Sequence, residues 1–103
     1  MTKTAIGKTG TVPLTPAWRC GDFVFTSGQV PADAAGKIVE GTIEEQTHAV
    51  MQRLGAILQM AGCTLQDVIK TTVWLEDARD FARFNAAYAS YFPGSPPARS
   101  TVE

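Results

Sequence analysis

The sequence predicts an α+β fold in which two helices pack on one face of a β-sheet. Three observations indicate this class. Short segments rich in β-branched and aromatic residues alternate with two longer segments of helical periodicity. Each helical segment carries a single apolar stripe, which one-sided packing requires. The chain has 103 residues, 45% of them apolar, so a single domain over residues 1–103 is expected.

The first part of the chain predicts short strands joined by turns. A strand is expected at Lys3–Ile6, followed by a loop over residues 7–16 that a glycine and two prolines interrupt. Residues 18–29 have the pattern of a hairpin. Its turn is expected at residues 20–22 and its β-prone second arm at Phe23–Thr26.

The first helix is the most clearly marked element. A loop at residues 31–36 and a short strand at residues 38–39 are expected before it. Thr42 is a natural N-cap, and Glu45 three residues later completes a capping box. One apolar face follows the helical period at Val50, Leu54, Ile57, Leu58 and Ala61. Gly62 is the expected C-terminal stop.

The second half predicts a strand, a helix and a last strand. Residues 68–75 form the strand, and alternation divides them between two faces. One face holds Ile69, Thr71, Val73 and Leu75, and the other holds Val68, Lys70, Thr72 and Trp74. A helix from Asp77 or Ala78 to Pro93 follows, with an aromatic stripe at Phe81, Phe84, Tyr88 and Tyr91. Residues 98–103 are a final extended run.

Charge and composition exclude several classes of partner. Nine basic and ten acidic residues leave a net charge of -1 with no basic tract, so nucleic acid is excluded as a partner. The apolar runs are too short to cross a membrane, and residues 1–7 lack the apolar stretch of a signal peptide. Cys20 and Cys63 lack metal-ligand spacing, so unpaired thiols, no metal site and a cytoplasmic location are expected.

Six segments form a specific series through their order and spacing. They are residues 19–31 (RCGDFVFTSGQVP), 44–47 (EEQT), 61–63 (AGC), 67–75 (DVIKTTVWL), 80–85 (DFARFN) and 97–103 (PARSTVE). Each is weak alone. Together they resemble the reactive-intermediate deaminase family, also called Rid or YjgF, over nearly the whole chain.

The resemblance implies a fold, an assembly and an activity. The fold is chorismate-mutase-like, a mixed β-sheet with two helices on one face. The assembly is a homotrimer around a sheet-lined barrel, with three sites in the clefts between subunits. The activity is hydrolysis of 2-aminoacrylate-type enamines and imines to 2-keto acids and ammonia, without a metal or a cofactor.

Two departures from the family pattern argue against catalytic turnover more than against substrate binding. Family members continue past the Pro-Ala-Arg-Ser motif for about one more strand-and-loop unit, which carries a glutamate thought to position the hydrolytic water. This chain stops at Glu103, so a C-terminal truncation and an absent final strand are expected. Many deaminating members also have a tyrosine in the early loop, where this chain has Leu14.

Arg99 is the expected catalytic and substrate-binding residue. Its planar guanidinium can hold a carboxylate through two parallel hydrogen bonds. The residues alone favour a surface salt bridge, and the family motif, which places an arginine here, reverses that preference. Thr101 faces the same side of the strand, and in the family the backbone N–H at this position helps to bind the carboxylate. Ser27 and Gly28 end the strand that borders the family pocket, although a plain turn is the alternative. Asn85 matches a family pocket residue, with a helix-surface amide as the alternative.

Two functions from different classes remain open. The first is an enamine/imine deaminase. The second is a non-catalytic trimeric protein that binds a small carboxylate or 2-keto acid, which Leu14 and the missing glutamate favour. Chorismate mutase activity, by fold analogy alone, is disfavoured because one arginine is too little for a dicarboxylate. His48 is the sole histidine and is expected at a solvated position, which argues against a nucleophile–histidine pair.

Overall fold

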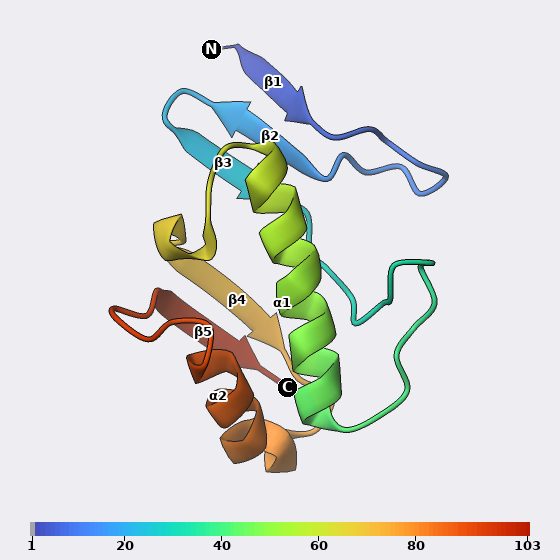
Figure 1. Cartoon of the computed structure of the whole chain (residues 1–103), viewed down its shortest axis with the longest axis vertical. Helices are drawn as coiled ribbons and strands as arrows, with labels where there is room; N and C mark the ends of the chain where they lie inside the picture. The colour runs from blue at the N-terminus through green and yellow to red at the C-terminus, as the bar shows by residue number, and fades with distance from the viewer. Residues whose placement is uncertain (1) are drawn as a thin grey trace.

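The computed structural model describes residues 2–103 and has the predicted α+β architecture (Figure 1). Its strands are β1 (Lys3–Ile6), β2 (Ala17–Cys20), β3 (Phe23–Thr26), β4 (Lys70–Trp74) and β5 (Ala98–Val102). They pair as two sheets. One is antiparallel with the order β1-β2-β3, and the other is the parallel pair β4-β5. Antiparallel and parallel pairing are thus both present, in two hydrogen-bonded pieces.

Two helices lie on one side of the strands, as predicted. α1 (Ile43–Met60) runs across the front of both sheets in Figure 1, and α2 (Phe81–Ala89) lies beside it over the two-stranded sheet. A 3-10 turn precedes β4 at Leu65–Asp67, and another precedes α2 at Ala78–Asp80. Within residues 2–103, neither helix combines the length and apolar character that a membrane crossing needs.

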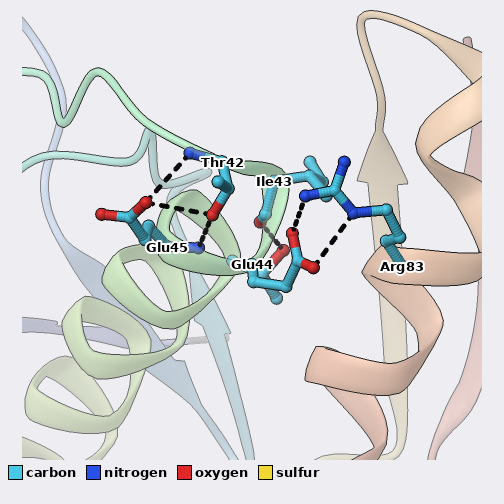
Figure 2. Close-up of polar contacts among 6 residues, drawn as sticks. Thr42, Ile43, Glu44, Glu45 and Arg83 are labelled. Carbon is cyan, nitrogen blue, oxygen red and sulfur yellow. Dashed lines mark hydrogen bonds and ion pairs between the residues drawn. The ribbon is translucent and has the colours of Figure 1, made fainter.

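The start and end of α1 follow the predicted signals. The Thr42 hydroxyl accepts the Glu45 N–H at 3.2 Å, and the Glu45 carboxylate accepts the Thr42 N–H at 3.2 Å (Figure 2). These reciprocal bonds satisfy two donors that a helix start leaves without intrahelical partners. Gly62 lies just past the helix with φ 77°, a conformation that glycine adopts without a Cβ penalty.

Removing the cap is expected to destabilise the fold measurably. Thr42→Ala removes the acceptor of the Glu45 N–H and should lower the free energy of unfolding by about 1 kcal/mol. Urea denaturation followed by circular dichroism measures this change. Thr11→Ala, in an exposed loop, is the matched control and should leave the midpoint unchanged. Equal midpoints for the two variants would mean that the cap does not stabilise α1.

An ion pair joins the first turn of α1 to α2. Arg83 donates from Nε and NH2 to the two carboxylate oxygens of Glu44, at 3.0 and 2.7 Å (Figure 2). The side-chain hydrogen bond from Arg83 lowers the pKa of the Glu44 carboxyl. Because the pair is exposed to solvent, it contributes to the relative placement of the helices more than to stability.

The core lies between α1, α2 and β4. Its buried cluster consists of Met51, Leu75, Phe84, Tyr88 and Phe92. The predicted stripe of α2 supplies Phe84 and Tyr88, whereas Tyr91 is half-buried and Phe81 is 44% exposed. From α1 the cluster takes Met51, which the predicted apolar face did not include. Phe81 lies outside this cluster and is partly open to solvent.

The structure corrects two details of the predicted strands. The strand begins at Lys70, because the 3-10 turn at Leu65–Asp67 interrupts the alternation before it. Val68 consequently packs against the core, and Ile69 is 68% exposed, the reverse of the predicted faces. At residues 38–39 there is only an isolated bridge between Ala32 and Ile38, not a strand.

The face of the sheets away from the helices exposes aromatic side chains. Ala17 is fully buried on the helix side of β2, so its neighbour Trp18 and the cross-strand partner Phe25 lie on the opposite side. On β4, Trp74 lies on that opposite side and is 72% exposed, which confirms the expected open face. Cys20 is also on β2, and no disulfide joins it to Cys63, as predicted.

Candidate functional site

Arg99 and Thr101 lie on the helix side of β5, where α2 covers the strand pair. Both side chains are half-buried, and alternate residues of β5 are exposed. In the parallel ladder Arg99 lies opposite Thr71, and Thr101 lies opposite Val73. The predicted shared face of Arg99 and Thr101 is therefore present.

The Arg99 guanidinium lies against three aromatic rings and has no hydrogen-bond acceptor within residues 2–103. Its central carbon is 5.6 Å from the Phe81 ring centroid, 5.4 Å from Phe84 and 5.1 Å from Tyr88. The other four arginines each donate to a protein oxygen: Arg19, Arg53, Arg79 and Arg83. An arginine held on rings with its N–H edges unused is a candidate anion site.

A small pocket lies at the carboxyl ends of β4 and β5, and Arg99 is not one of its lining residues. Its volume is about 310 Å³, at the lower end of the range for small-molecule sites. It is lined by Leu75, Ala78, Phe81, Thr101, Val102 and Glu103. Phe81 contacts Arg99 and also lines the pocket, so this ring lies between the guanidinium and the pocket wall that it shares with Thr101. Glu103 is the ionisable side chain among these six.

Asn85 carries a polar atom without a partner. Its side-chain Oδ1 is buried and has no hydrogen-bond partner among the described residues. An unsatisfied buried acceptor is destabilising by about 1–3 kcal/mol, so such atoms in proteins call for an explanation. Asn85 lies on α2 directly after Phe84, and it does not line the small pocket.

Ser27 and Gly28 lie in a different part of the chain from Arg99. They follow β3 at the end of the three-stranded sheet, and the Ser27 hydroxyl donates to the Thr15 carbonyl at 2.5 Å. A Cβ placed on Gly28 would meet nothing within 4 Å inside the chain. The predicted site residues therefore form two groups, one on each sheet.

A second, larger pocket lies elsewhere. It has a volume of about 750 Å³ between α1 and the loop at residues 29–39, and none of the five predicted site residues lines it. Its arginine, Arg53, already donates to the Gln29 side chain at 3.1 Å and to the Asp33 carbonyl at 3.2 Å. We favour the smaller pocket as the functional site, because Arg99, which contacts the Phe81 ring of its wall, has N–H donors without an acceptor in the described residues.

His48 does not form a catalytic pair. The ring is exposed, as predicted, and its Nδ1 lies 2.7 Å from the Tyr91 hydroxyl. Burial raises the pKa of the Tyr91 phenol, so that group stays protonated at neutral pH. In the described part of the chain, no three His, Cys, Asp or Glu side chains gather in a way that could hold a metal ion.

Sequence reasoning missed two features of this site. The stripe of Phe81, Phe84 and Tyr88 was interpreted as core alone, although all three rings contact Arg99. Glu103 lines the pocket beside Thr101, a position that the sequence did not assign to it. The ring contacts follow from the crossing of α2 over β5, and no signal in the sequence specifies that crossing.

Comparisons with known proteins agree on one group of relatives. A family model described as Endoribonuclease L-PSP matches residues 5–103. A RutC family protein from Pyrococcus horikoshii is 49% identical over 92 residues, covering 88% of this chain and 73% of the relative. The 2-iminobutanoate/2-iminopropanoate deaminase of Mus musculus is 39% identical, covering 88% and 68%. A solved structure of the conserved Rid protein family from Yersinia pestis matches with a TM-score of 0.93 at 34% identity, covering 99% of this chain and 86% of that one.

Proposed function

Because the chain belongs to the Rid/YjgF family, whose family model bears the description Endoribonuclease L-PSP, we propose that it is a cytoplasmic deaminase of reactive 2-imino acids and their enamine tautomers. The products are a 2-keto acid and ammonia. The observation that carries this proposal is Arg99, whose guanidinium has no acceptor within residues 2–103 and contacts Phe81, a residue that lines a pocket of small-molecule size. The name of the mouse relative points to the same substrate class.

Hydrolysis of a 2-imino acid requires chiefly that the protein position the substrate and the attacking water. The imine carbon is electrophilic, so water adds to it, a proton moves to nitrogen, and the C–N bond of the resulting carbinolamine breaks to release ammonia. Arg99 binds the substrate carboxylate and fixes the imine carbon relative to the pocket. Glu103 lines the same wall and is suited to accept the proton of the attacking water. Thr101 offers its backbone N–H to the carboxylate.

The test is a trapping assay. An L-amino-acid oxidase generates 2-iminobutanoate in the presence of semicarbazide, and the semicarbazone is followed by its absorbance. Adding the protein should lower the rate of semicarbazone formation in proportion to its concentration, whereas Arg99→Ala protein should not. An undiminished rate at a large excess of wild-type protein would rule out the deaminase.

The runner-up is a non-catalytic binding protein for small 2-keto acids. Leu14 favours it, because this side chain is apolar and brings no hydroxyl to the early loop. Binding of 2-ketobutyrate by calorimetry, together with an unchanged semicarbazone rate, is the result that selects this function over the deaminase.

We also propose a homotrimer, with residues 1–103 as a single domain in each copy. The open face with Phe25 and Trp74 supports it, because exposed aromatic patches mark contact surfaces. In a trimer, the Ser27 and Gly28 group of one copy can face the Arg99 group of the next, so that three sites form between subunits. Asn85 is proposed to line the same clefts.

Sedimentation equilibrium should find about three chains per particle, as closed cyclic symmetry allows. Trp74→Glu places a charge on the open face and should dissociate the particle. Ile38→Glu, at an apolar loop position that is 48% exposed, is the control and should leave the particle intact. A wild-type monomer at micromolar concentration would contradict both the trimer and the shared sites.

A further inference from the structure

Three rings of α2 surround the Arg99 guanidinium. Phe84 and Tyr88 are buried and belong to the core, whereas Phe81 is half open to solvent. All three ring centroids are 5.1–5.6 Å from the central carbon of the guanidinium, within the range of a cation–π contact. Contact with a single ring would leave the arginine side chain free to adopt other rotamers. Contact with three rings on one face of the same helix restricts the conformations that it can adopt.

Tyr88 is itself held in place by a polar contact with β4. Its hydroxyl lies 2.8 Å from the Thr71 Oγ1, and Thr71 is the residue directly opposite Arg99 in the parallel ladder. Tyr88 also packs against Phe84, with ring centroids 5.3 Å apart. Thr71 therefore holds the Tyr88 ring from the strand position that lies directly opposite Arg99, so the ring and the guanidinium that it contacts are fixed at the same level of the sheet.

We propose that Phe81, Phe84 and Tyr88 are positioning residues that hold Arg99 ready for its ligand, with Tyr88 fixed by Thr71. This inference rests on the proposed carboxylate-binding function. Because the rings contact the guanidinium, an anion can approach only along the unused N–H edges. That direction of approach favours a flat carboxylate that accepts two parallel hydrogen bonds. A guanidinium that is already ordered also loses less conformational freedom on binding.

The first experiment measures pyruvate binding by calorimetry in ring variants. Phe81→Leu removes a half-exposed ring and should leave the fold intact. It should weaken binding about two- to fivefold, the factor that one exposed cation–π contact is worth. Tyr88→Phe keeps the ring and removes its hydroxyl, and it should weaken binding by a similar factor. Tyr91→Phe is the matched control, since it removes the contact with His48 and no ring beside Arg99.

A double-mutant cycle separates positioning from packing. If Tyr88 acts through its bond to Thr71, then Thr71→Val, Tyr88→Phe and the double variant should all lose the same factor in affinity. If the double variant instead loses the product of the two single-variant factors, Thr71 and Tyr88 act independently, and the hydrogen bond does not connect them. Thermal melts of each variant exclude unfolding as the cause.

Nuclear magnetic resonance tests the inference without a ligand. In wild type, the Arg99 Nε–H should give a sharp signal displaced by ring currents, and Phe81→Leu and Tyr88→Phe should broaden it or move it towards the shift of a solvated arginine. Tyr91→Phe should not. A wild-type signal at the solvated position overturns the inference even if pyruvate binds. A displaced signal without pyruvate binding supports the inference and removes only the proposed function.

Discussion

Arg99→Ala is expected to weaken binding of pyruvate or 2-ketobutyrate roughly thirtyfold to several-thousandfold. Loss of one member of a partly buried, hydrogen-bonded charge pair typically costs about 2–5 kcal/mol, which gives these factors. The guanidinium has no other acceptor within residues 2–103, so its donors are available for the ligand carboxylate. Calorimetry of wild-type and variant protein measures the change.

Two variants make this test specific. Arg99→Lys should recover part of the affinity, because an ammonium keeps the charge but not the planar fork. Arg79→Ala makes the same change in net charge at a side chain that is 90% exposed, and it should bind like wild type. Equal affinity in wild type, Arg99→Ala and Arg99→Lys contradicts the anchor role. If Arg99→Ala unfolds instead, the result favours a structural role in which Arg99 stabilises the fold by packing against the three aromatic rings.

The predictable part of the fold is the part that local signals specify. The capping box of Thr42 and Glu45 and the stop at Gly62 depend on neighbouring residues only, and α1 begins and ends where they predict. The hairpin turn is equally local, with Gly21 at φ 59° between β2 and β3. These elements could be placed from the sequence because their physical causes lie within a few residues.

The errors arose where contacts between distant segments determine which residues form a strand and which side chains are buried. The 3-10 turn before β4 reverses the faces of Val68 and Ile69, because it packs Val68 against the core. The bridge from Ala32 to Ile38 stays isolated, since one pair of residues is too short for a ladder. Alternation within a strand cannot reveal where the strand begins, so the pattern was right and its starting point was wrong.

The candidate site was predicted chiefly by resemblance. Nothing in the period of the last strand distinguishes Arg99 from an arginine in a surface salt bridge, and the family motif supplied that distinction. The structure adds that Arg99 is the arginine without an acceptor in the described chain, while Arg83 on α2 is paired with Glu44. The site roles of Ser27, Gly28 and Asn85 stay predictions, because Ser27 and Gly28 lie on the other sheet from Arg99 and the buried Asn85 Oδ1 has no partner among the described residues.

Met51→Ala is expected to give the largest loss of stability, about 2–5 kcal/mol in the free energy of unfolding. Met51 is 4% exposed and packs in the cluster that joins α1 to α2 and β4. Truncation removes buried apolar area and leaves a cavity between three elements that cannot all close around it. A domain of this size has only about 5–15 kcal/mol of stability in total, so the variant should unfold at a clearly lower urea concentration.

Met60→Ala is the matched control for this prediction. It makes the same chemical change on the same helix, but Met60 is 56% exposed, so little buried area is lost. Surface substitutions of this kind usually change stability by less than about 0.5 kcal/mol. Urea denaturation of both variants, at a fixed protein concentration so that assembly does not differ, gives the comparison. Similar midpoints for Met51→Ala and Met60→Ala would mean that the space at Met51 is refilled by its neighbours. The half-buried Leu54 on the next turn of α1 is the side chain that would have to move.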